Sequence, residues 1–132
     1  MGIYRADVDQ KVLANLLRLK DKPVYITENG CAADDDRFRI AYIALHLAAF
    51  RQAMDMGVDL KGYLYWSLLD NYEWGSYLPQ FGLVACDRRT FVRTPKPSAF
   101  FFKEIIEANG FSGRTVRKYL DRLPSRSDGI KA

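Results

Sequence analysis

Two carboxylates and two tryptophans stand where a protein chain could carry chemistry. The first is Glu28, which follows a short run of strand-forming residues, Val24 to Thr27, while the Asn-Gly pair after it ends that strand. A carboxylate at the carboxyl end of a strand, just before a turn, lies where α/β barrels place their catalytic groups. The position of Glu28 therefore indicates a reactive site built at the end of a strand.

The other three residues follow a second, aromatic strand. Residues 62–66 read Gly-Tyr-Leu-Tyr-Trp, and the segment from Trp66 onward carries Glu73 and Trp74. The face of an indole ring packs well against apolar C–H groups, and a carboxylate accepts hydrogen bonds from hydroxyl groups. A sugar presents both kinds of surface, so indoles beside carboxylates favour a carbohydrate ligand.

Four stretches of the chain resemble the C-terminal part of the family 1 glycoside hydrolases, the β-glucosidase and β-glycosidase family. They are ITENG at 26–30, WSLLDNYEW at 66–74, QFGLVACD at 80–87 and RTPKPSAFFFKEII at 93–106. The resemblance runs from about residue 21 to residue 111. ITENG alone is a moderate signal, whereas ITENG followed by WSLLDN-x-EW and then FGL is a specific one.

The length of the chain implies that the resemblance covers only part of a barrel. The chain has 132 residues, whereas a complete (β/α)8 barrel needs about 250. In the family, ITENG lies on the seventh strand and WSLLDN on the eighth. The resemblance therefore implies an α/β fold made of the C-terminal β/α units, about strands 7 and 8, of a (β/α)8 TIM barrel that is incomplete as a barrel. Residues 1–111 are expected to form this fragment, and residues 112–132 a basic tail that is short-helical or frayed.

The resemblance also implies roles for individual residues. In the family the Glu of TENG is the nucleophile of retaining β-glycoside hydrolysis, and this role maps onto Glu28. Trp66 corresponds to the platform under the sugar, and Glu73 to the carboxylate that accepts hydrogen bonds from hydroxyls 4 and 6. Trp74 corresponds to an indole N–H donor, and Phe81 to an aromatic wall.

Glu73 could also be interpreted as the general acid and base that works with Glu28. The resemblance instead implies that Glu73 binds the sugar hydroxyls. The family's acid/base lies in an Asn-Glu-Pro motif, and this chain contains no such triplet. The isolated chain is therefore expected to be inactive and to work as part of a complete barrel. The alternative is a non-catalytic remnant or sugar-binding module. A β-glycoside is the expected ligand, and the possible protein partners are the missing N-terminal barrel portion or a second copy.

Hydrophobic periodicity and turn residues predict alternating helices and strands. The expected helices are 8–20, 37–56 and 98–108, the expected strands are 24–27 and 60–66, and residues 67–97 are expected to be irregular. This order predicts parallel strands joined by crossover helices. A partial barrel would leave apolar side chains uncovered, and the candidates for exposure are Tyr63, Leu64, Tyr65, Phe100, Phe101 and Phe102.

Composition adds few constraints. The net charge of +4 is concentrated after residue 111, but the basic tail lacks interleaved aromatics, which disfavours nucleic acid or a membrane as partner. The two cysteines, Cys31 and Cys86, have no metal-type spacing, and free thiols weakly favour the cytoplasm. The start of the chain has no signal-peptide pattern, and no cofactor or metal is expected.

Overall fold

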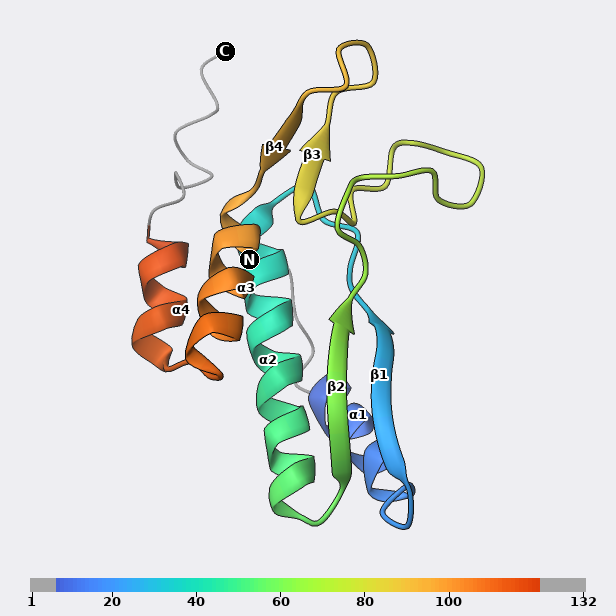
Figure 1. Ribbon diagram of the computed structural model, residues 1–132, viewed down its shortest axis with the longest axis vertical. Coiled ribbons are helices and arrows are strands. Elements are labelled where there is room, and N and C mark those ends of the chain that lie inside the picture. The colour runs from blue at the N-terminus through green and yellow to red at the C-terminus, as the bar shows by residue number, and fades with distance from the viewer. Residues whose placement is uncertain (1–6, 122–132) are drawn as a thin grey trace.

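The computed structural model describes residues 7–121 and shows helices and strands in alternating order (Figure 1). They are α1 (Asp7–Leu17), β1 (Pro23–Asn29), α2 (Asp36–Asp55), β2 (Asp59–Tyr65), β3 (Val84–Cys86), β4 (Arg93–Pro95), α3 (Pro97–Ala108) and α4 (Gly113–Leu120). The expected helices and strands are confirmed, with boundaries that shift by up to three residues. Among residues 7–121, no helix combines the length and apolar character that crossing a bilayer requires.

β1 and β2 pair in parallel, as expected, and α2 is the crossover between them (Figure 1). One side of this sheet, which we call the helix face, carries Val24, Ile26, Leu60 and Tyr63, all of which pack with the α2 side chains Phe50 and Ala53. The other side, which we call the open face, carries the exposed side chains of Tyr25, Thr27 and Leu64. Within residues 7–121, helices therefore cover one side of the sheet only.

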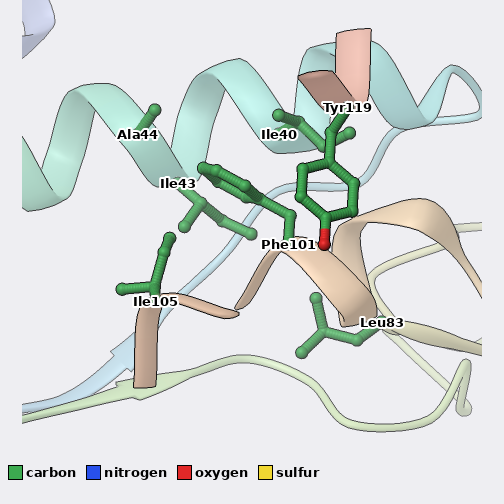
Figure 2. Close-up of a cluster of buried hydrophobic side chains, with 7 residues drawn as sticks. All are labelled: Ile40, Ile43, Ala44, Leu83, Phe101, Ile105 and Tyr119. Carbon is green, nitrogen blue, oxygen red and sulfur yellow. The ribbon is translucent and has the colours of Figure 1, made fainter. Parts of the chain in front are cut away.

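α2 takes part in two hydrophobic clusters of the described residues. Its C-terminal half contributes Phe50 and Ala53 to the cluster with α1, β1 and β2. Its N-terminal half packs with α3, α4 and Leu83 in the cluster that Figure 2 shows, made of Ile40, Ile43, Ala44, Leu83, Phe101, Ile105 and Tyr119. Asp35 is the N-cap of α2, because its side chain accepts a hydrogen bond from the backbone N–H of Arg37.

The stretch expected to be irregular contains a short hairpin. β3 and β4 pair antiparallel, with Val84 opposite Pro95 and Cys86 opposite Arg93. The Asp87 carboxylate accepts hydrogen bonds from the backbone N–H groups of Arg89 and Thr90 in the turn, which hold the pKa of that carboxyl below its usual range. The prediction of residues 67–97 as wholly irregular is therefore wrong for this hairpin.

The C-terminal helices correct one further expectation. Phe101 was expected among the exposed aromatics, but it is 0% exposed because it packs between Tyr119 and Phe111. Leu64 and Phe100 are exposed as expected, at 62% and 52%, whereas Tyr63, Tyr65 and Phe102 are partly buried against the two hydrophobic clusters. The first part of the expected tail forms α4, and its buried Tyr119 hydroxyl donates to Glu104 at 2.8 Å. Residues 122–132 lie outside the described part, and a domain boundary after residue 111 stays a prediction.

Candidate functional site

The carboxyl ends of β1 and β2 lie side by side. Asn29 is the partner of Tyr65 in the sheet, and the backbone N–H of Trp66 donates to the carbonyl of Asn29 at 3.0 Å. Gly30 permits this close approach, because a Cβ at this position would lie 1.7 Å from the carbonyl oxygen of Trp66. The glycine after the predicted nucleophile thus lets the two strand ends that carry Glu28 and Trp66 come together.

A shift in strand register decides which way Glu28 faces. Ile26 pairs with Tyr63 and Asn29 with Tyr65, so two residues, Thr27 and Glu28, lie opposite one residue of β2. This is a β-bulge, a device that re-aims side chains. Ile26 packs on the helix face and the Asn29 side chain bonds Tyr42 of α2, so both neighbours of the bulge point to the helices. Thr27 and Glu28 are both exposed, and because they bulge between two residues that face the helices, we infer that they lie on the open face.

The loop after β2 holds Glu73 against Trp66. The indole N–H of Trp66 donates to the Glu73 carboxylate at 2.7 Å. The backbone of Glu73 exchanges two hydrogen bonds with Ser76, at 2.8 and 3.0 Å, and so closes a tight turn. Trp74 and Gly75 in this turn have φ angles of +45° and +87°. Glycine adopts positive φ angles more readily than other residues, which suits Gly75 to its place in the turn. The turn therefore sets Glu73 beside the platform that the sequence predicted.

Trp74 and Phe81 form the aromatic side of the same region. Their ring centroids lie 5.8 Å apart at an interplanar angle of 72°, an edge-to-face contact. Trp74 is 86% exposed, so its indole N–H and ring are open to a ligand. The structure therefore joins Trp66 to Glu73 and Trp74 to Phe81 by direct contact. It brings Glu28 to the same edge through the backbone hydrogen bond between Trp66 and Asn29.

Asp70 braces this loop through the backbone of Gly82 and the side chain of Lys96. The Asp70 carboxylate accepts a hydrogen bond from the N–H of Gly82 at 2.7 Å and pairs with Lys96 at 2.9 Å. Both charged side chains are nearly buried, with 11% and 12% of their surface exposed. A Cβ on Gly82 would lie 2.2 Å from the backbone nitrogen of Asp70, so this second glycine also permits a close approach. These contacts hold the start of the loop after β2, at Asp70, against the residue that follows Phe81.

Arg39 of α2 ties the two site loops together, and sequence reasoning missed it. Its side chain is 1% exposed and donates to the carbonyls of Ala33 and Gln80, each at 2.6 Å. The guanidinium also pairs with Asp36, which in turn accepts two hydrogen bonds from Ser98. A buried charge needs such partners to be tolerated. The loop after β1 is thereby held to the loop before Phe81.

The predicted site lies on an open surface. A groove of about 1250 Å³ runs elsewhere, between β2, α2 and α3, and none of the five predicted site residues lines it. Its lining is largely apolar and includes Leu60, Leu64 and Phe102. In the loop after β1, burial raises the pKa of the Cys31 thiol from 9.0 to about 11, so the thiol is protonated at neutral pH.

Comparisons with known proteins identify the family. The model of glycosyl hydrolase family 1 matches residues 8–111. The chain is 41% identical over 103 residues to a β-galactosidase of Sulfolobus acidocaldarius, covering 77% of this chain and 21% of that protein. It is 42% identical over 97 residues to β-glucosidase A of Thermotoga maritima, covering 66% and 22%. The chain belongs to glycosyl hydrolase family 1, which confirms the resemblance read from its motifs.

Solved structures of family 1 glycosidases also match this chain. The β-glycosidase from Pyrococcus horikoshii matches with a TM-score of 0.79 and 38% identity, over 89% of this chain and 28% of that one. The family 1 β-glucosidase from Thermotoga maritima matches with a TM-score of 0.75 and 36% identity, over 79% and 27%. Such family 1 glycosidases are TIM barrels, so the α/β fold described above is part of such a barrel. The chain spans about a fifth of the length of these curated relatives.

Proposed function

We propose that this chain is the nucleophile-bearing part of a retaining β-glycosidase and acts within a complete barrel. In this proposal β1 and β2 are the seventh and eighth barrel strands, and the open face is the barrel interior. The observation that carries the proposal is the exposure of Glu28 on the open face, at the strand end paired with Trp66. A barrel encloses its reacting groups at this end.

In the proposed reaction, a carboxylate oxygen of Glu28 forms a bond to the anomeric carbon while the glycosidic C–O bond breaks. The leaving oxygen takes the bonding electron pair and a proton from a general acid. Water, deprotonated by the same group, then cleaves the glycosyl ester and regenerates Glu28. Since the family's Asn-Glu-Pro motif is absent from the sequence, that general acid comes from the remaining part of the barrel.

The other site residues hold the sugar. Trp66 supplies the platform, Trp74 an indole N–H donor and Phe81 a wall. Glu73 accepts hydroxyl hydrogen bonds, and its fixed bond to Trp66 suits a carboxylate that orients a ligand. A proton-transferring group must instead face the leaving oxygen, so the bond to the platform supports glycone binding as the role of Glu73.

The partner we propose is the N-terminal portion of the barrel. The groove between β2, α2 and α3 supports this proposal because its lining residues include the exposed apolar side chains of Met54 and Ile106. Apolar surface of this extent in a groove marks a place where protein packs. A sugar-binding role without catalysis is the alternative, and it is favoured by the fact that the sugar-contacting residues are present while the general acid is not.

An activated fluoro-sugar tests these proposals, since its leaving group needs little protonation. Purified chain is mixed with a polypeptide that carries the first six barrel strands of a family member, and mass spectrometry locates the label. We expect label on Glu28 in the mixture, little on the chain alone, and none in Glu28→Gln. Glu73→Gln should weaken binding and leave the labelled residue unchanged. Label on Glu73, or turnover by the chain alone, would overturn the assignment, and sugar binding without label would favour the alternative.

A further inference from the structure

The bulge in β1 sets the direction of Glu28, so whatever fixes the bulge also fixes the predicted nucleophile. A strand alternates sides at every residue, so Val24, Ile26 and Glu28 would share one side of an unshifted strand. The structure instead places Val24, Ile26 and Asn29 on the helix face. Without the bulge, in what we call the slipped register, Glu28 would take the place of Asn29 opposite Tyr65 and would point toward α2.

Asn29 is held from two elements at once. Its side-chain amide donates to the hydroxyl of Tyr42 on α2 at 3.1 Å, and its side-chain carbonyl accepts from the hydroxyl of Tyr63 on β2 at 3.1 Å. Its backbone carbonyl accepts from the N–H of Trp66 at 3.0 Å. Burial raises the pKa of both tyrosines, which keeps the hydroxyls protonated. The groups around the Asn29 side chain thus match an amide at this position in the bulged register.

We propose that Asn29 is a positioning residue that locks the β1 bulge through Tyr42 and Tyr63 and thereby keeps Glu28 on the open face. This inference rests on the proposed role of Glu28 as nucleophile. In the slipped register a carboxylate would face Tyr42 and Tyr63 in the place of the amide, and Asn29 would move to the open face. The two registers therefore differ in which of two adjacent polar residues is offered to substrate.

The test compares two substitutions of Asn29 in the 132-residue chain. Asn29→Ala removes both side-chain bonds. Asn29→Asp keeps an acceptor to which both tyrosine hydroxyls can donate, so it should rescue the register. Tyr63→Phe removes only the hydrogen bond from Tyr63 to Asn29, and it provides the test if Asn29→Ala does not fold. Asn15→Ala, on the exposed side of α1, is the matched control.

Cross-strand NOEs and amide exchange in the folded chain provide the readout. In the wild type, in Asn15→Ala and in Asn29→Asp, we expect NOEs that pair Asn29 with Tyr65 and a slowly exchanging Trp66 amide. In Asn29→Ala, we expect Glu28 to pair with Tyr65 in part of the molecules and exchange at Trp66 to quicken at least tenfold. In Tyr63→Phe we expect a smaller change of the same kind.

Two results would overturn the proposal: wild-type NOEs and exchange in both Asn29→Ala and Tyr63→Phe, or the same loss in Asn29→Asp as in Asn29→Ala. In the assembled barrel, Asn29→Ala should also lower the rate constant for labelling by at least tenfold and leave the binding constant of the fluoro-sugar unchanged. Absence of label in wild type would refute the role of Glu28 while the NOEs still decide the register.

Discussion

Replacing Gly30 by alanine should separate the two strand ends that form the site. The added Cβ would lie 1.7 Å from the carbonyl oxygen of Trp66, and real Cβ atoms essentially never approach closer than 3.0 Å. The obstructing atom belongs to the backbone, so β1 and β2 must move apart where Trp66 bonds Asn29. Overpacking costs about 1–3 kcal/mol and the lost hydrogen bond about 1 kcal/mol. We expect a loss of about 2–4 kcal/mol, or a Tm lower by about 8–16 °C.

The assay for Gly30→Ala is thermal and urea unfolding followed by circular dichroism and by tryptophan emission. The chain has only two tryptophans, Trp66 and Trp74, so emission reports on the site itself. Gly110→Ala is the matched control because a Cβ there meets no atom within 4 Å, and we expect it to change stability by less than about 0.5 kcal/mol. If Gly30→Ala is as stable as Gly110→Ala and its emission is unchanged, the close approach does not hold the strand ends together.

Three further predictions concern charge, pH and ligand binding. Asp70→Ala leaves the nearly buried Lys96 without its carboxylate, so urea unfolding should show a loss of about 2–4 kcal/mol that Lys96→Met partly restores; additive losses would contradict a coupled pair. The thiol of Cys31 has a raised pKa when folded and ionises first in the unfolded chain, so stability should fall as pH rises from about 9 to 11. The thiol contributes a loss on the order of 2 kcal/mol over that range, so the total loss should be smaller by about that amount in Cys31→Ala, where the buried tyrosines still titrate. Trp66→Phe removes the donor to Glu73 and should raise the Kd of a glycone analogue for the assembled barrel roughly tenfold by calorimetry; an unchanged Kd would argue against that bond.

The alternation of helices and strands could be read from the sequence because apolar spacing is decided locally. The long helix was expected at 37–56 and forms at Asp36–Asp55, with its cap at the acidic run. The β3–β4 hairpin was not expected, because each of its strands is three residues long and too short to show an alternating pattern. Its existence depends on pairing across the turn at Asp87, which sequence periodicity does not report.

The site could be predicted in part, because its motifs are short and contiguous in the sequence. The motifs located Glu28, Trp66 and Glu73, but the face on which Glu28 lies depends on a bulge, and simple alternation would have turned it toward α2. Arg39 and Lys96 were missed because a charged residue in a helix or loop normally faces water. Their burial follows from carbonyls and a carboxylate that arrive from distant parts of the chain.

The sharing of α2 between two hydrophobic clusters has a consequence for folding. The N-terminal half of the helix, with Ile40 and Ile43, belongs to the cluster with α3 and α4. The C-terminal half, with Phe50, belongs to the cluster with α1 and the sheet. Each turn of a helix supports the next, so opening of one half of α2 weakens the packing of the other half. The two halves of the molecule are therefore expected to open as one cooperative unit, with similar amide protection at both ends of α2.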